Sequence, residues 1–339
     1  MVTKLADLAH QVGVSTATIS RVLNGRDGVS EETRDKVLQA LDAMGYERPY
    51  RLKKHSRGLI GIVVPNLEQP LFALFAQFIS GALARHDLTP IICPQDAAGV
   101  SEDDYIDMLL DHHACGIIFI AGHHADQTSD PLRYQRLLSA ALPIVLINGF
   151  TPAVNGYFIS DDTEAGTEAA LAHLISLGHR RIGLANGPVK FIPMARRHDR
   201  FVQMMTDTFG PGDYERDIET SLLTVEGGQA AATQLIDRGC TALLCGSDFM
   251  ALGAIQAALR KGLSIPRDLS LIGYDDSVVM GFIQPALTTI RQSTLAMGQA
   301  AVSIMVSALS GIPSTAGQEL LFRPELVVRM STGRAPRRG

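Results

Sequence analysis

The chain has 339 residues, 46% of them hydrophobic and 19% charged, a composition that excludes a small disulfide-stapled module and a disordered chain and suits a globular protein of about two domains. Four cysteines without a CxxC pair indicate a reducing compartment. No apolar run approaches the roughly 18 residues of a membrane helix, and the N-terminus lacks the apolar core of a secretory signal. We therefore expect a cytoplasmic protein with no membrane partner.

Charge is distributed unevenly along the chain. Residues 1–57 carry ten Lys or Arg against seven Asp or Glu, whereas the remainder carries twenty against twenty-eight. A small basic segment on an acidic body suits a head that approaches a polyanion. Chance accounts equally well for a difference of so few charges, so the motifs must decide.

The first 46 residues predict three short helices. The first follows a possible cap at Thr3, a turn lies at Gly13, the second helix opens at Ser15, and the third runs from Ser30 to Gly45. Apolar residues at helical spacing give each helix one core face. This is the helix-turn-helix arrangement, and an ordinary helical hairpin with a solvated polar face is the alternative.

The second predicted helix carries candidate DNA-reading residues. Thr16, Ala17 and Arg21 lie on the side away from the core, where a recognition helix faces the major groove. Arginine geometry favours a bidentate contact with guanine, so Arg21 is the expected base reader. Short polar side chains nearby suit phosphate oxygens, which position a protein on DNA without reading sequence: Thr18, Ser20, Asn24 and Thr33.

Four stretches of the head, Leu5–Ala9, Gly13–Asn24, Val29–Val37 and Leu41–Tyr46, closely resemble the DNA-binding head of the lactose-repressor (LacI/GalR) family. Members of that family bind operators as dimers, so the resemblance implies a homodimer and a two-fold symmetric operator as partners. The DNA-contacting residues expected from the pattern and the resemblance together are Thr3, Ser15, Thr16, Ala17, Thr18, Ser20, Arg21, Asn24, Ser30, Thr33, Tyr46 and Leu52.

The hinge after the head is shorter than is usual in the family. Thirteen residues, Glu47–Leu59, separate Tyr46 from Ile60. Counting back from Ile60 places Leu52 at the position of a leucine that enters the minor groove and kinks the duplex. In the family this leucine belongs to a short hinge helix that forms on DNA. Whether the shortened hinge of this chain still forms such a helix stays open. Its basic side chains should at least add salt-sensitive phosphate affinity.

Beyond residue 58, short apolar runs alternate with Ala- and Leu-rich helical stretches such as Phe75–Ala84 and Thr167–Leu177. This alternation predicts parallel sheets with helices on both faces, and the number of runs predicts two such units. Ligands of these folds bind beyond the carboxyl ends of the strands. The predicted strands are Ile60–Val64, Pro90–Cys93, Gly116–Ile120, Ile144–Ile147, Arg181–Ala185, Ala242–Cys245 and Leu269–Gly273.

An enzyme is the rival from another class. The Rossmann glycine fingerprint, the phosphate-binding GxxxxGK[ST] loop, the GxSxG elbow and HExxH are all absent from the sequence. The pairs His112–His113 and His123–His124, with Cys240 and Cys245, suggest a metal or redox sensor only weakly, because adjacent histidines point in different directions and no spacing matches a zinc signature. We expect no catalytic residue, metal or cofactor, and keep an α/β enzyme with a helical appendage as the distant alternative.

The body also resembles the LacI/GalR pattern, through Ile60–Pro65, Leu177–Ile182, Ile272–Asp276 and Leu287–Ile290 among other stretches. The resemblance implies an α/β periplasmic-binding-protein-like core of two Rossmann-like subdomains, with the chain crossing between them three times. The expected bounds are 1–46 for the all-α helix-turn-helix head, 47–58 for the hinge, 59–331 for the core (about 59–159 with 289–318, and 160–288 with 319–331) and 332–339 for a flexible tail.

The resemblance further implies an effector pocket between the subdomains. Charged residues there would hold neighbouring hydroxyls and aromatic rings would stack on an apolar sugar face, which suits a polyol. Lys190–Pro193 and Leu223 depart from sugar-binding relatives, so the effector is an unusual sugar or no sugar. The expected lining residues are Phe72, Asp162, Phe191, Arg197, Ser247, Phe249 and Asp275.

Two of these pocket residues have other interpretations: Phe72 could be plain core and Asp275 a strand-end cap.

The function predicted from the whole sequence is a sequence-specific DNA-binding transcription regulator, a repressor, whose operator affinity a small molecule controls. A regulator that answers a partner protein or a phosphorylated metabolite is the alternative. Whether the effector induces or corepresses, and whether the assembly is a dimer or a tetramer, stay open.

Overall fold

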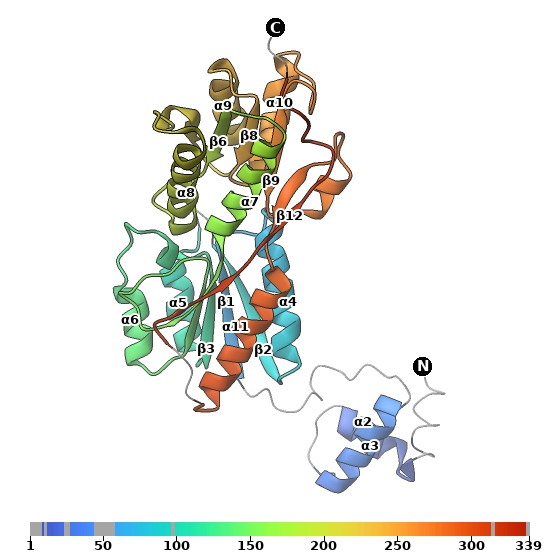
Figure 1. Cartoon of the computed structure of the whole chain (residues 1–339). Helices are drawn as coiled ribbons and strands as arrows, with labels where there is room; N and C mark the ends of the chain where they lie inside the picture. Colours follow the sequence, from blue (N-terminus) through green and yellow to red (C-terminus); the bar gives the residue numbers. More distant parts are fainter. Residues whose placement is uncertain are drawn as a thin grey trace. The chain divides into compact units, whose positions relative to one another are not determined.

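The structure is a computed structural model (Figure 1), and it describes residues 9, 12–23, 28–43, 58–95, 99–312 and 316–336. The chain divides into two compact units, Met1–Arg57 and Gly58–Gly339. Each unit has a hydrophobic core of its own, and the larger one has two layered halves. Within the described residues, no helix is long and apolar enough to cross a membrane.

The smaller unit contains α2 (Thr16–Leu23) and α3 (Glu31–Ala43). The side-chain oxygens of Ser15 and Ser30 accept the backbone N–H three residues later, at 3.0 and 3.3 Å, and so cap the two helices as the sequence predicts. Gly13, in the turn before α2, has a φ of +72°, a conformation that favours glycine. Most of the predicted first helix lies outside the described residues. The small core consists of Ala9, Ile19, Val22 and Val37.

The first half of the larger unit is a six-stranded parallel sheet with the strand order β11-β5-β4-β3-β1-β2. Helices α4 and α11 pack on one face, and α5 and α6 on the other. The 3-10 helix η2 (His123–Ala125) follows β3. The element bounds are Gly58–Val64 (β1), Pro70–Ala84 (α4), Leu88–Pro94 (β2), Glu102–Asp111 (α5), Gly116–Ile120 (β3), Leu132–Ser139 (α6), Ile144–Ile147 (β4), Tyr157–Asp161 (β5), Thr294–Leu309 (α11) and Glu319–Phe322 (β11).

The second half is a six-stranded sheet with the order β12-β10-β9-β8-β6-β7, in which only β12 is antiparallel to its neighbour. Helices α9 and α10 cover one face, and α7 and α8 the other. The bounds are Thr163–Ser176 (α7), Ile182–Asn186 (β6), Ile192–Phe209 (α8), Glu215–Asp217 (η3), Ile218–Thr220 (β7), Val225–Asp237 (α9), Ala242–Cys245 (β8), Asp248–Arg260 (α10), Ser270–Tyr274 (β9), Val278–Gly281 (η4), Thr288–Arg291 (β10) and Glu325–Val327 (β12).

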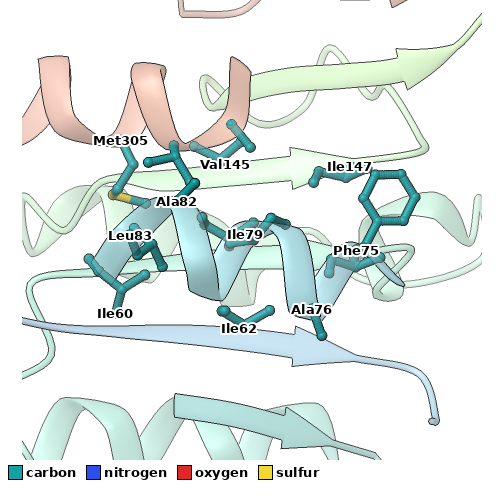
Figure 2. Close-up of a cluster of buried hydrophobic side chains, with 14 of the residues drawn as sticks. Ile60, Ile62, Phe75, Ala76, Ile79, Ala82, Leu83, Val145, Ile147 and Met305 are labelled. Carbon is teal, nitrogen blue, oxygen red and sulfur yellow. The ribbon is translucent and has the colours of Figure 1, made fainter. Parts of the chain in front are cut away.

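The core of the first half shows why alternating apolar elements form this fold. Figure 2 shows Ile60 and Ile62 of β1 on the side of the sheet where α4 presents Phe75 and Ile79. The next residue, Val63, faces the opposite core, under α5 and α6. Both faces of the central strands are therefore buried, which explains their continuous apolar sequence.

The predicted fold class is confirmed, but all three crossings between the halves were placed a few residues too early: residues 160 and 161, predicted in the second half, end β5 in the first sheet. Residues 289–291, predicted in the first half, belong to β10 in the second sheet, and residues 319–322, predicted in the second half, form β11 in the first sheet. The crossings follow β5, β10 and β11, near residues 162, 292 and 323. The reason is that β11 pairs in parallel with β5, from Glu319 beside Phe158 to Phe322 beside Asp161, and a short edge strand carries no sequence pattern that selects its sheet.

Candidate functional site

The first candidate site is the exposed face of α2. Thr16, Ala17 and Arg21 are exposed, while Ile19 and Val22, on the opposite face, are fully buried. This division leaves the three predicted base-reading residues free to enter a major groove.

The predicted phosphate-contacting hydroxyls take part in the helix caps. The Ser15 and Thr18 hydroxyls lie 2.8 Å apart, and the Ser30 hydroxyl donates to the Thr33 hydroxyl at 2.8 Å. Ser15, Ser30 and Ser20 are exposed, so their oxygens lie at the surface of the head. Four further predicted residues lie outside the described part of the chain: Thr3, Asn24, Tyr46 and Leu52.

The second candidate site is a cavity of about 210 Å³ between the two halves of the larger unit, hereafter the subdomains. Pro65, Ala121, Asn148 and Gly246 line it, and each directly follows a strand. The cavity thus lies at the carboxyl ends of strands from both sheets, where parallel α/β folds bind ligands.

Five of the seven expected effector-binding residues line this cavity: Phe72, Phe191, Arg197, Ser247 and Asp275. The other two do not. Asp162 caps α7 by accepting the Ala165 N–H at 3.0 Å, and Phe249 packs against the core around α9 and α10. Asp161, the last residue of β5, lines the wall in place of Asp162.

Arg197 of α8 is the central charge of the cavity, with only 1% of its surface exposed. Its Nη1 donates to the Gly246 carbonyl at 3.1 Å, and its guanidinium carbon lies 4.1 Å from the centroid of the Tyr274 ring. Its Nε has no hydrogen-bond partner. A buried donor without a partner costs stability unless a ligand satisfies it.

Asp161 and Tyr274 connect the subdomains at the cavity wall. The Tyr274 hydroxyl donates to Asp161 Oδ2 at 2.5 Å, and Asp161 Oδ1 has no partner. Burial raises the pKa of Asp161 to about 7, although Tyr274 and Arg197 act in the opposite direction. Two side chains that line the cavity, one from each subdomain, thus carry a buried acceptor and a buried donor without a partner among the described residues.

Asp275 is held in an unusual backbone conformation just beyond β9, with a φ of +108°. Gln292 Nε2 donates to its Oδ1 at 2.8 Å, and burial, followed by the charge of Asp248, raises the pKa of Asp275 well above its usual value. The neighbouring Asp276 accepts from Arg291 and Arg329, each at 2.6 Å, so two arginines fix the turn that directs Asp275 into the wall.

Several lining residues were missed by the sequence reasoning. Asn66 and Asn148 each follow a strand closely, and their position at carboxyl ends is the signal that could have found them. The others lie on a helix end, on strands or on a crossing segment, where no local pattern marks them. The missed polar residues are Asn66, Gln69, Asn148, Asp161, Thr163, Tyr274 and Gln292.

The described lining residues combine apolar surface with groups that can bind hydroxyls. Phe72, Phe191 and Leu223 supply apolar surface, and Arg197, Asp161 and Asp275 supply donors and acceptors for charge-assisted bonds. Among the described residues, no group of three or more His, Cys, Asp or Glu could hold a metal ion. The arrangement recognises a polar ligand with an apolar face.

Two family models match separate parts of the chain. The model described as bacterial regulatory proteins, lacI family, matches residues 4–49, and the model of a periplasmic binding protein-like domain matches residues 171–332. The first match covers the part of the head that contains α2 and α3. The second covers most of the second subdomain, together with α11 and β11 of the first subdomain.

Similar proteins match over nearly the whole length. The HTH-type transcriptional regulator MalR of Streptomyces coelicolor is 49% identical, over 99% of this chain and 98% of its own. A solved structure of the lac repressor dimer bound to operator and the anti-inducer ONPF has a TM-score of 0.72 at 26% identity, over 96% of this chain and 98% of that one. A complex of the transcriptional regulator CelR with cellobiose has a TM-score of 0.71 at 26% identity, over 96% and 99%. With a capped helix-turn-helix head, a two-subdomain core and a relative 49% identical along its length, the chain belongs to the lacI family of bacterial DNA-binding transcription regulators and is not an enzyme.

Proposed function

We propose that the chain is a homodimeric repressor of the cytoplasm whose affinity for a two-fold symmetric operator is controlled by a sugar or sugar derivative in the cavity between its subdomains. One observation carries the proposal: Arg197 of the second subdomain and Asp161 of the first line the same cavity, and each has a buried side-chain atom, Nε and Oδ1, with no hydrogen-bond partner among the described residues. A ligand with adjacent hydroxyls suits such a pair of side chains, because each hydroxyl both donates and accepts.

Comparison with solved relatives supports both halves of the proposal. A lac repressor is bound to operator in one of them, and CelR is bound to cellobiose in another. In this chain the proposed base readers are Thr16, Ala17 and Arg21, all exposed on α2. The proposed effector residues are the five expected residues that line the cavity, with Asp161 in place of Asp162.

The cavity explains how an effector would act on the head. Its walls come from both sheets, so a ligand that bridges them favours one relative orientation of the subdomains. The chain enters the first subdomain at β1, directly after the segment that leads from the head. A change in orientation therefore changes how two heads are presented to the two operator halves, and the coupling energy equals the difference in effector affinity between the orientations.

A phosphorylated metabolite fits this cavity less well than a neutral polyol. A phosphate dianion needs several cations or N–H donors, and among the described lining residues the Arg197 guanidinium is the one cationic side chain. A neutral ligand does not need such a set of cations. A regulator that responds to a partner protein or a phosphorylated metabolite is the alternative, and the experiment below distinguishes it from a regulator that responds to a neutral sugar.

The experiment has two arms. Selection of preferred sites from random duplex DNA should enrich a two-fold symmetric consensus, and a thermal-shift screen against neutral sugars, sugar phosphates and polyols should identify a stabilising neutral ligand. That ligand should then change operator affinity in a binding titration. Stabilisation by sugar phosphates alone, or a stabilising sugar that leaves operator affinity unchanged, would overturn the effector part of the proposal.

A further inference from the structure

One loop from each subdomain meets the other beside the effector cavity. Asp126, after η2, forms an antiparallel bridge with Phe191, which directly precedes α8. The Gln127 N–H donates to the Lys190 carbonyl at 2.8 Å, and Lys190 Nζ lies 2.8 Å from Asp126 Oδ2. We call these four residues the clasp. Phe191 also lines the cavity, so the clasp includes part of the cavity wall.

The carboxylate of the clasp is largely buried and oriented. The Asp126 side chain is 8% exposed, whereas that of Lys190 is 49% exposed. Asp126 Oδ1 accepts from the Thr128 N–H at 2.9 Å and from the Thr128 hydroxyl at 2.6 Å, and these bonds direct Asp126 Oδ2 to Lys190. Burial alone would raise the pKa of Asp126, but Lys190 and Thr128 bring that pKa below its usual value. Asp126 is therefore charged at neutral pH.

The first loop is anchored firmly to its own subdomain. Glu102, at the start of α5, is fully buried and accepts from the His123 N–H at 3.0 Å and from the Tyr134 hydroxyl at 2.5 Å. The same Tyr134 oxygen accepts the His124 N–H at 2.8 Å. This network ties His123 and His124, just before Asp126, to the first subdomain.

The second loop is anchored at the start of α8. The Phe191 N–H donates to the Pro188 carbonyl at 3.1 Å, and the Phe191 carbonyl accepts from the Met194 N–H at 2.9 Å. The Lys190 ammonium lies 4.9 Å from the centroid of the Phe191 ring. Lys190 thus contacts the ring that lines the cavity and the carboxylate of the opposite subdomain at the same time.

A second ion pair between the subdomains lies in a different kind of place. Arg196 binds Glu319 through two bonds of 2.9 and 2.8 Å, and Glu319 opens β11, which leads directly into a crossing segment. The chain itself keeps the subdomains together there. The clasp joins two loops, and opening of the cleft there must break its contacts; Gln69 Nε2, which donates to the Leu223 carbonyl at 3.3 Å, is another contact across the cleft.

From these contacts we infer that Lys190 and Asp126 are positioning residues that hold the cavity closed and keep Phe191 in its wall. The effector role of this wall rests on the proposed function, but the closure itself is a property of the protein without ligand. Effector entry then requires the ion pair to break, and effector contacts with Phe191 require it to form again.

Hydrogen exchange of the Gln127 amide reports directly on the clasp, because its N–H donates across the cleft. The full-length protein without any sugar is compared with Lys190→Met and Asp126→Asn, of which the second keeps an Oδ1 for Thr128. Lys190→Arg is the conservative rescue. Lys261→Met is the matched control, since Lys261 forms an ion pair of 2.5 Å with Asp237 inside the second subdomain.

We expect the protection of the Gln127 amide, measured against the intrinsic exchange rate of each variant's own sequence because residue 126 directly affects that rate, to fall about threefold or more in Lys190→Met and Asp126→Asn, with no further loss in the double variant. Lys190→Arg and Lys261→Met should exchange like the wild type. Raising KCl from about 0.05 to 1 M should accelerate exchange in the wild type but not in Lys190→Met, because salt screens only an existing ion pair.

A fluorescence measurement tests the position of the ring. The chain has no tryptophan, so Phe191→Trp introduces a single reporter. Its quenching by acrylamide should increase when Lys190→Met is added and should not increase when Lys261→Met is added.

Three results would overturn the inference: unchanged Gln127 exchange in both clasp variants, equal acceleration in Lys261→Met, or acceleration that extends to the core strands β3 and β4 and so reports unfolding. Unchanged quenching of the tryptophan would overturn the role of the clasp in placing the wall. No sugar is present in either measurement, so a negative sugar screen counts against the proposed function alone.

Discussion

The Tyr274 hydroxyl donates a 2.5 Å hydrogen bond to Asp161 Oδ2. This bond joins the last residue of β9 in the second subdomain to the last residue of β5 in the first. Both side chains are buried, and the guanidinium of Arg197 lies over the tyrosine ring. The same three residues line the effector cavity, so the groups available to a ligand also hold the subdomains together.

Removal of this bond should destabilise the protein. Tyr274→Phe leaves Asp161 buried without its partner, and an unsatisfied buried polar group costs about 1–3 kcal/mol. Urea unfolding of the wild type and the variant should show that loss in the free energy of unfolding. Tyr105→Phe is the control, because its hydroxyl donates to the Pro94 carbonyl inside one subdomain at a more exposed site. A variant as stable as the wild type would contradict the role assigned to the bond.

Stability should depend on pH through Asp161. Burial raises the pKa of this carboxyl group from 3.8 to about 7 in the folded protein, so the folded state binds the proton more tightly than the unfolded state. The contribution of Asp161 protonation to the free energy of unfolding is then complete below pH 4 and is lost as the pH rises through 7. Urea unfolding at several pH values should show this decline in the wild type and a smaller decline in Asp161→Asn. Equal pH dependence in the two proteins would contradict the raised pKa.

Arg21 should carry sequence preference in DNA binding. Arg21→Ala should weaken binding to the selected operator by about 1–3 kcal/mol and leave binding to random DNA less affected, because a base contact exists only at the specific site. Titrations on both duplexes at one salt concentration measure the difference. The core residues Ile19 and Val22 lie on the opposite face of α2, so the fold of the head should persist. Equal losses on both duplexes would remove Arg21 from the base-reading role.

Arg197 should be required for the effector response and not for DNA binding. Arg197→Ala should abolish the change in operator affinity caused by the effector while operator binding without effector persists, since the side chain contacts only the cavity and its wall. Arg200→Ala is a matched control on the same helix, where Arg200 pairs with Glu168 away from the cavity. An unchanged effector response in Arg197→Ala would mean that the cavity residues are assigned wrongly.

The sequence by itself determined the architecture and the head. Apolar runs such as Gly116–Ile120 and Ile144–Ile147 coincide with strands, because a strand buried on both faces needs continuous apolar residues. Ser15 and Ser30 cap helices as expected, because a cap is a contact within three residues. These features depend only on the spacing of nearby residues, which can be read directly from the sequence.

Only the tertiary structure decided which side chains share the cavity and where the chain crosses. Asp161 and Tyr274 are 113 positions apart, and their contact depends on how two sheets face each other. Asp162, expected in the wall, caps α7 because β5 ends one residue earlier. The strand β11 joins the first sheet through backbone hydrogen bonds to β5, and backbone pairing leaves no mark on a four-residue sequence. Long-range packing settles such questions, because its energy belongs to pairs of distant residues and not to either residue alone.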